Sequence, residues 1–176
     1  MAHLRNPVGP EDHAQGKTDA LITLVEYGDY QCPHCGRAYP IVKAVQEHFG
    51  DRLRFVFRNF PLREAHPWAE AAAETAEFAA TEGKFWPMHD VLFENQNRFD
   101  GALFPRLGSQ LGLNPGALQQ ALDDGLHAAR VRHDFSGGVR SGVNGTPTFF
   151  INGQRHDGNF EFDALVETIS LQIPRE

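Results

Sequence analysis

The sequence predicts an α/β fold in which a helical segment interrupts an alternation of strands and helices. Apolar, β-branched runs at residues 20–27, 53–58 and 148–151 are typical of buried strands. Apolar residues recur at three- and four-residue spacing from 33 to 49, directly after the first run, as in an amphipathic helix. Further helical patterns fill the chain between the second and third runs. Strands that alternate with helices are typical of α/β proteins.

The first helix is expected to begin at Pro33 and to end at Gly50. Proline suits the first helical turn, because its missing N–H has no partner there and its fixed φ matches a helix. Cys32, the residue before it, is therefore expected at the helix N-cap. Unpaired backbone N–H groups and the positive end of the helix dipole point at a side chain in that position.

Five helices are predicted between the second and third strands, and one after the third strand. The expected ranges are 68–81, 87–95, 102–111, a helix capped by Asn114 with Pro115 at its first position, 126–140 and 161–171. Aromatic residues of this segment are expected to pack in its core: Trp68, Phe78, Phe85, Trp86 and Phe93. Histidines without ligand spacing are expected at the surface or at helix caps: His66, His89, His127, His133 and His156. Arginines in or beside the second strand are expected to reach solvent: Arg52, Arg54 and Arg58.

The composition is that of a globular protein, with 176 residues, 41% hydrophobic and 22% charged residues and a net charge of −7. A chain of this length forms one domain, or one domain with an insertion. An acidic balance without a basic cluster argues against nucleic acid as a partner. The apolar stretches are shorter than the roughly 18 residues of a membrane span. The first fifteen residues lack the apolar core of an export signal, so the expected location is cytoplasmic, with a periplasmic or extracellular location after signal removal as the alternative.

The sequence Cys32-Pro33-His34-Cys35 contains the only two cysteines of the chain. A zinc site usually needs two such pairs, and there is no second pair, so no metal is expected. A structural disulfide that closes a four-residue loop would constrain the unfolded chain very little. Redox catalysis is the favoured interpretation, because a helix N-terminus stabilises a thiolate and the thiolate is the nucleophile. Protonated His34 would add a second positive charge nearby.

Glu26 lies six residues before the first cysteine, at the end of an apolar strand. Burial of a carboxyl group penalises its charged form and raises its pKa. Two interpretations are open. Glu26 is either a strand-end residue that reaches water, or a buried proton acceptor for Cys35.

The stretch VNGTPTFFING, residues 143–153, is the second candidate part of the site. Pro147 at the mouth of a strand is a candidate for a cis peptide bond after Thr146. The alternative is a trans proline at the start of an edge strand. A second Asn-Gly pair after the strand indicates a hairpin. Tyr30, two residues before Cys32, is expected to be exposed at the loop tip and is a candidate for contact with a docking polypeptide.

In combination, these motifs resemble the DsbA family of thiol–disulfide oxidoreductases, over about residues 15 to 172. Cys-Pro-His-Cys is that family's active-site sequence, Glu26 lies where its superfamily carries a buried acid, and Gly-Thr-Pro-Thr matches its cis-proline loop. The resemblance implies a thioredoxin fold with an inserted all-helical subdomain. The implied parts are a thioredoxin-like domain at 15–62 and 143–172, a helical insert at 63–142 and an N-terminal extension at 1–14.

The resemblance also implies an activity without a cofactor. Cys32 would form a mixed disulfide with a protein or peptide substrate, and Cys35 would resolve it. Thr146 would offer its backbone N–H and C=O to the substrate chain. The redox partner would be a thioredoxin-type protein, glutathione or a membrane oxidase.

Two features of this chain bear on which DsbA-like group it resembles. The best-known exported members carry valine where this chain has Thr146, so the chain looks closer to the cytosolic DsbA-like proteins of bacteria. A sister group, the kappa-class glutathione transferases and isomerases, uses a serine nucleophile, and the two intact cysteines count against it. A glutathione-dependent transferase or isomerase remains an alternative, as does a non-enzymatic module that binds peptides or metal.

Overall fold

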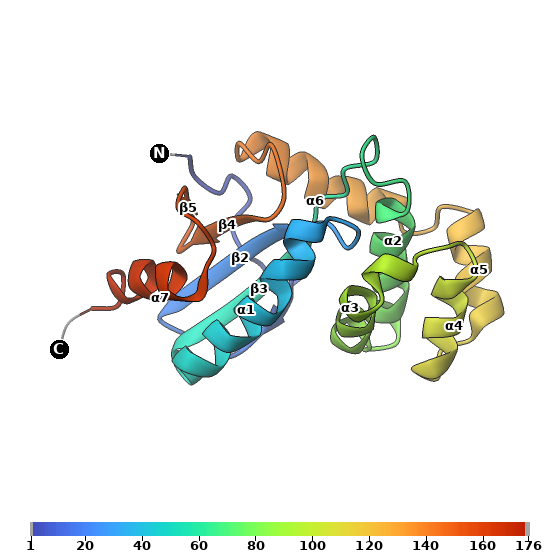
Figure 1. Cartoon of the computed structure of the whole chain (residues 1–176), viewed down its shortest axis with the longest axis horizontal. Coiled ribbons are helices and arrows are strands. Elements are labelled where there is room, and N and C mark those ends of the chain that lie inside the picture. The colour runs from blue at the N-terminus through green and yellow to red at the C-terminus, as the bar shows by residue number, and fades with distance from the viewer. Residues whose placement is uncertain (1, 175–176) are drawn as a thin grey trace.

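The computed structural model describes residues 2–174 as a five-stranded mixed sheet with helices on both faces (Figure 1). The strand order is β1-β3-β2-β4-β5. The central strand β2 (Ile22–Gly28) pairs in parallel with β3 (Leu53–Asn59) and antiparallel with β4 (Thr148–Ile151). Short strands form the two edges, β1 (His13–Gln15) beside β3 and β5 (Gln154–His156) beside β4. The mixed sheet confirms the predicted α/β class.

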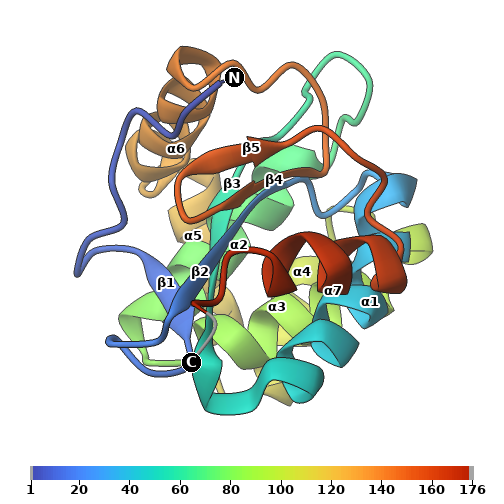
Figure 2. The same ribbon diagram turned by 90° about the vertical axis from the view of Figure 1, so that its left-hand side faces the viewer.

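Helices α1 (Pro33–Phe49) and α7 (Phe162–Ser170) cover one face of the sheet, and α6 (Ala128–Arg140) covers the other (Figures 1 and 2). Side chains of β2 alternate between these faces, as the period of a strand requires. Leu24 packs in the cluster under α1, whereas Val25 packs in the smaller cluster on the α6 side. Because β2 is buried on both faces, it reads in the sequence as a continuous apolar run.

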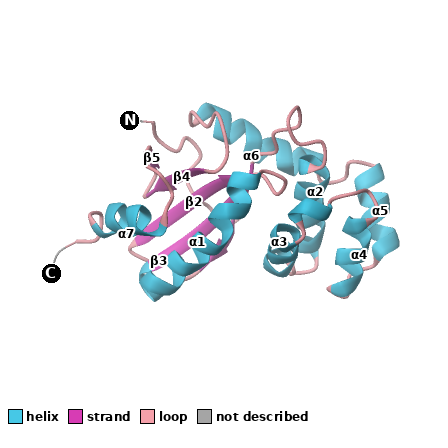
Figure 3. Ribbon diagram, viewed as in Figure 1, coloured by secondary structure: helices cyan, strands magenta, loops and turns pink. Residues whose placement is uncertain are grey.

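Four further helices lie together beside the sheet, as the secondary-structure colouring of Figure 3 makes clear. They are α2 (Ala69–Thr81), α3 (Phe85–Glu94), α4 (Leu103–Gln110) and α5 (Pro115–Asp123). Buried apolar side chains of α2, α3 and α4 belong to the same cluster as those of α1, so a continuous core joins the helical segment to the sheet. The fold therefore brings the helical segment against the start of α1.

The predicted helices and the three predicted strands are all present, with ends shifted by a few residues. Asn114 caps α5 as expected, and its Oδ1 accepts a hydrogen bond of 2.9 Å from the N–H of Ala117. The edge strand β1 was not predicted, whereas β5 is the partner strand of the hairpin that Asn152-Gly153 indicated. Each has three residues, and such short segments are extended only because a neighbouring strand pairs with them.

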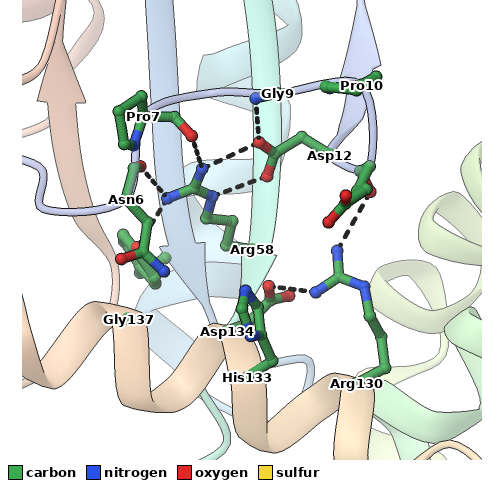
Figure 4. Close-up of a pocket in the computed structure, with 12 residues that line it drawn as sticks. Asn6, Pro7, Gly9, Pro10, Asp12, Arg58, Arg130, His133, Asp134 and Gly137 are labelled. Carbon is green, nitrogen blue, oxygen red and sulfur yellow. Dashed lines mark hydrogen bonds and ion pairs between the residues drawn. The ribbon is translucent and has the colours of Figure 1, made fainter.

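The expectation that Arg58 reaches solvent is wrong, because its side chain is almost fully buried. All five of its donors are used (Figure 4). It binds both carboxylate oxygens of Asp12 at 2.7 and 2.9 Å, the carbonyl oxygens of Asn6 and Pro7, and the hydroxyl of Tyr27. The N-terminal segment lies over this face of β3, and its carbonyl groups and Asp12 take the place of water around the guanidinium.

The cavity in Figure 4 lies between the N-terminal segment and α6, with a volume of about 490 Å³. Its second cation, Arg130, is paired with Asp134 and also donates to the carbonyl oxygen of Glu11. Both guanidinium groups in this cavity are already paired. We therefore assign these two arginines the role of holding the N-terminal segment against β3 and α6.

We expect Asp12→Ala to destabilise the protein by roughly 3 kcal/mol, because it leaves Arg58 buried without its counter-ion. The matched control is Asp51→Ala, which removes one partner of an exposed ion pair with Lys17 and should change stability very little, because solvent screens that pair. Urea unfolding of the two variants measures both values. Equal, small losses would show that the buried pair contributes no more than a surface pair.

Candidate active site

The two cysteines lie where β2 ends and α1 begins. Cys32 is the N-cap of α1, with an extended backbone, and Pro33 occupies the first turn, as predicted. Both cysteines are free thiols, and Cys35 is fully buried one turn further along the helix. The side chains of Pro33 and His34 are exposed beside them.

The pKa of Cys32 falls from its ordinary value of 9.0 to about 5. The largest cause is a hydrogen bond from the side chain of Cys35, and partial burial opposes it by penalising the charge. A hydrogen bond with the side chain of Thr146 and the backbone N–H groups of Cys35 and His34 lower the pKa further. Cys32 is therefore a thiolate at neutral pH, with the start of α1 as part of its stabilisation.

The loop before β4 forms the wall opposite Cys32. The peptide bond between Thr146 and Pro147 is cis, as predicted. The thiol of Cys32 donates to the carbonyl oxygen of Thr146 at 3.5 Å. The hydroxyl Oγ1 of Thr146 is buried and has no hydrogen-bond partner among the described residues while Cys32 is a thiol. It is therefore free to donate to Sγ once Cys32 has lost its proton.

Cys35 has the opposite electrostatic environment, and its pKa is raised well above 9.0. Burial is the largest cause, followed by the hydrogen bond to Cys32 and the charges of Glu26 and Cys32. Only the N–H of Asp29, 3.4 Å from Sγ, acts in the other direction. The two thiols thus differ strongly in acidity, although they lie one helical turn apart.

Glu26 lies in the core behind the cysteines, with 2% of its surface exposed, so the interpretation as a strand-end residue that reaches water is wrong. Burial, and then the charge of Cys32, raises its pKa to about 8. Its Oε1 is buried without a hydrogen-bond partner among the described residues. A side chain at Gly28 would be 3.1 Å from Oε1 and 2.4 Å from the ring of Phe57, so the strand end needs glycine here.

Asp29 is a site residue that the sequence analysis missed. It is fully buried, and its carboxylate oxygens have four hydrogen-bond partners. Its Oδ1 accepts from the N–H groups of Gln31 and Cys32 at 2.8 and 3.2 Å, and its Oδ2 accepts from Leu62 N–H at 2.9 Å and contacts His66 Nδ1 at 2.8 Å. An aspartate that bonds to N–H groups two and three residues ahead forms an Asx-type turn, which is a readable local signal. Its contacts with the loop at 62–66 have no such signal.

Two glutamines connect the active-site turn to the helical segment. Gln96 donates from Nε2 to the carbonyl oxygens of Tyr30 and Cys32 at 2.9 and 2.7 Å. Gln31 accepts at Oε1 from the N–H of Trp68 at 2.7 Å. The peptide groups on both sides of the nucleophile are therefore held by residues from another part of the chain.

Tyr30 corrects a prediction about the same turn. We expected an exposed ring, but it has 1% exposure and packs on Phe57 and Phe93. Its hydroxyl contacts Nδ1 of His89 at 3.0 Å. His89 was expected at the surface and is also buried, which lowers its pKa to about 3. The turn folds inward because the helical segment offers an aromatic pocket and a polar partner for the ring.

The low pKa of Cys32 leads us to expect a reduced form that is more stable than the disulfide form at pH 7. The folded pKa lies below the unfolded value, so this stabilisation is complete above pH 9 and is lost as the pH falls through 5. With solvent screening at the rim of the site, it amounts to roughly 2 kcal/mol at pH 7, or about 40 mV. Thermal unfolding of both forms at pH 7 tests this, and a higher melting temperature for the disulfide form would contradict it.

The buried carboxyl group makes the opposite contribution to stability. The pKa of Glu26 rises from 4.5 to about 8 on folding, so the carboxyl group ionises in the unfolded chain while it stays protonated in the folded chain. The folded state therefore loses stability as the pH increases through this range. At pH 7 the loss is about 3 kcal/mol. We expect Glu26→Gln to remove it, so that the variant gains stability over the parent between pH 5 and 8. Urea unfolding of the parent and the variant across this range measures the gain. A constant difference in stability between the two proteins at every pH would contradict the raised pKa of Glu26.

The chain is similar to known proteins in sequence and in structure. The thioredoxin family model matches residues 9–170. The structure is similar to BdbD from Bacillus subtilis, with 27% identity, a TM-score of 0.87 and 98% of each chain covered. It is also similar to alpha-DsbA1 from Wolbachia pipientis, with 22% identity, a TM-score of 0.83 and coverage of 97% of this chain and 94% of the other. The likeness confirms the predicted DsbA-like thioredoxin fold.

Curated relatives are larger proteins. "Na(+)/H(+) antiporter NhaA 1" from Salinispora arenicola is 41% identical over 93% of this chain and 25% of its own length. "Na(+)/H(+) antiporter NhaA 1" from Mycobacterium sp. strain KMS is 42% identical over 94% of this chain and 28% of its own length. This chain thus spans about a quarter of the curated relatives it matches. Among residues 2–174, no helix combines the length and apolar character needed to span a bilayer. On the family match over residues 9–170, the chain belongs to the thioredoxin family.

Proposed function

We propose that this chain is a thiol–disulfide oxidoreductase that exchanges disulfides with protein or peptide substrates through Cys32 and Cys35. The observation that carries the proposal is the difference in acidity between the two thiols. One has a pKa of about 5 at a helix N-terminus, and the other is buried with a pKa well above 9.0. Exchange needs a nucleophilic thiolate and a second thiol held back until it can attack.

In the reductive direction, the Cys32 thiolate attacks one sulfur of a substrate disulfide. A bond forms between Cys32 Sγ and that sulfur, and the other substrate sulfur leaves as a thiolate. Cys35 then loses its proton and attacks Cys32 Sγ. The mixed disulfide breaks, the substrate leaves as a second thiolate, and the protein keeps the Cys32–Cys35 disulfide. Oxidation of a substrate dithiol follows the same steps in reverse, with Cys32 as the sulfur that is attacked.

Glu26 is proposed as the proton acceptor for Cys35. Cys35 cannot ionise readily on its own, because burial and nearby negative charge oppose it. A base with a pKa close to neutrality is suited to this transfer, and Glu26 has a pKa of about 8 in the same buried region. The difference in acidity between the two thiols therefore supports this role for Glu26.

Thr146 is proposed as the residue that holds the substrate chain. Its carbonyl oxygen lies 3.5 Å from Cys32 Sγ, and Pro147 after it has no N–H to offer. A short free backbone edge of this kind pairs with an extended peptide independently of its sequence. Tyr30 has no part in this proposal, because its ring is in the core.

The proposed redox partner is a thioredoxin-type protein, glutathione or a membrane oxidase. The proposed location of this chain is the cytoplasm. The names of the curated relatives add membrane transport proteins as a class to test, because those proteins contain a stretch similar to this one. Thiol trapping in cells, which reports whether the Cys32–Cys35 pair is oxidised, distinguishes a reducing from an oxidising compartment.

Insulin reduction and dithiol-peptide oxidation by the parent, Cys32→Ser and Cys35→Ser test the function. We expect no exchange with Cys32→Ser, because it lacks the thiolate. Cys35→Ser should form a mixed disulfide that accumulates, because the resolving thiol is gone. Full turnover of Cys35→Ser with glutathione would favour a glutathione-dependent transferase instead. No exchange by the parent with either substrate would favour a non-enzymatic binding module.

A further inference from the structure

The peptide group between Gly28 and Asp29 lies against the resolving cysteine. The N–H of Asp29 donates to Sγ of Cys35 at 3.4 Å, and Cys35 is fully buried. A hydrogen bond from an N–H group stabilises the charge of a thiolate, and here it acts against burial and the charges of Glu26 and Cys32. This N–H is therefore placed to stabilise Cys35 as it ionises.

The direction of this N–H depends on the segment that follows β3, residues 60–66. The carbonyl oxygen of Gly28 accepts a hydrogen bond of 2.8 Å from the N–H of Phe60. In a trans peptide group, the C=O and the N–H point in opposite directions. Because Phe60 holds the carbonyl group of Gly28, the N–H of Asp29 faces away from that segment and toward Cys35.

The carboxylate of Asp29 joins the active-site turn to the same segment. Its Oδ1 accepts from two N–H groups of the turn, and its Oδ2 accepts from the N–H of Leu62 at 2.9 Å and lies 2.8 Å from Nδ1 of His66. A carboxylate only accepts, so Nδ1 of His66 is the donor. The side chain of Asp29 has no exposed surface, and these four groups take the place of water around it. Residues 60–66 therefore hold Asp29 at both its peptide group and its side chain.

A carboxylate is an unexpected group at this position, because its charge opposes the ionisation of a nearby thiol. A neutral serine or asparagine could accept from the N–H groups of the turn. Neither could also accept from Leu62 and His66 with a second oxygen, because asparagine has an NH₂ group there and serine has no second polar atom. The second oxygen of Asp29 is thus what connects the turn beside Cys35 to the segment after β3.

We propose that Asp29 is a positioning residue for the resolving step. Anchored by residues 60–66, it holds its own N–H on Sγ of Cys35 while that sulfur becomes a thiolate. The inference rests on the proposed function. In this step Cys35 gives its proton to Glu26, the acceptor proposed above, and its Sγ attacks Cys32 Sγ. The bond between Cys32 and the substrate sulfur breaks, and the substrate leaves as a thiolate. The N–H of Asp29 keeps its hydrogen throughout, so its contribution is separate from proton transfer.

Three variants loosen or restore the anchor of Asp29. Asp29→Asn keeps an oxygen for the N–H groups of the turn but directs an NH₂ group at the N–H of Leu62. His66→Leu removes the donor to Oδ2, whereas His66→Asn can place an N–H close to the position of Nδ1. The side chain of His66 is 18% exposed, so its variants test the anchor without a change in the buried carboxylate.

Asp100→Asn is the matched control. Oδ1 of Asp100 accepts from the N–H groups of Ala102 and Leu103, two and three residues ahead, at 2.9 and 2.8 Å. Oδ1 of Asp29 makes the same two hydrogen bonds in its own turn. The control therefore makes the same chemical change in the same kind of turn, but in one that leads into α4 and not into α1.

The test follows formation and decay of the mixed disulfide between Cys32 and a dye-labelled peptide disulfide, by acid quenching, from pH 6 to 9. We expect Asp29→Asn to slow decay about ten-fold at pH 7, because a weakened hydrogen bond leaves Cys35 harder to ionise. The pH–rate profile of decay should move to higher pH for the same reason. His66→Leu should slow decay about three-fold, and His66→Asn should return it to near the parent rate. Formation should stay within about two-fold of the parent, because the Cys32 thiolate keeps its stabilising groups.

The direction of the shift separates position from charge. If Asp29 acted only through its negative charge, Asp29→Asn would make Cys35 easier to ionise. Faster decay with a profile at lower pH would therefore overturn the proposal and leave the oxidoreductase intact. Decay at the parent rate in both Asp29→Asn and His66→Leu would do the same.

The remaining outcomes concern folding and the function itself. Equal slowing of formation and decay, or slow decay in Asp100→Asn, would show a general structural effect and would overturn the proposal. If Asp29→Asn does not fold, the comparison of His66→Leu with His66→Asn decides the test, and equal rates in these two variants would overturn the anchor. A parent protein that forms no mixed disulfide would overturn the proposed function, and this inference with it.

Discussion

The stabilisation of one thiolate at the start of α1 is the interaction on which the rest of the site depends. Cys32 receives hydrogen bonds from Cys35, from backbone N–H groups of the first turn and from Thr146, and together they outweigh the penalty of partial burial. The same geometry makes Cys35 a poor acid, because it donates to Cys32 and lies deeper in the core. This asymmetry is the reason that Glu26 is proposed as the proton acceptor for Cys35.

The helical segment does more than enlarge the core. Gln96 binds the carbonyl oxygens on both sides of the nucleophile's turn, and Gln31 binds the start of α2. Tyr30 reaches into the segment and contacts His89. The helical segment therefore bears on the placement of Cys32.

Much of this arrangement could be predicted from the sequence, because its signals are local. Pro33 after Cys32 determines where α1 begins, and Asn114 with Pro115 determines where α5 begins. The position of Glu26 in an apolar run made burial one of two interpretations, and the structure selects it. These features depend on neighbours within a few residues, so they can be read without knowledge of the packing.

The errors arose where distant segments meet. Arg58 has the pattern of an exposed strand residue, and it is buried only because Asp12 and the N-terminal carbonyl groups cover it. Tyr30 has the position of a loop tip, yet its burial depends on aromatic side chains from β3 and α3. Asp29 was missed for a similar reason, since half of its hydrogen bonds come from the loop at 62–66.

The most direct test of the account is a titration of Cys32 itself, by thiolate absorbance at 240 nm or by the rate of alkylation. We expect a midpoint near pH 5 in the parent protein, and a higher midpoint in Cys35→Ala, because the hydrogen bond from Cys35 is the largest stabilising contribution. A midpoint near 9.0 in the parent, the ordinary value of a cysteine, would contradict it.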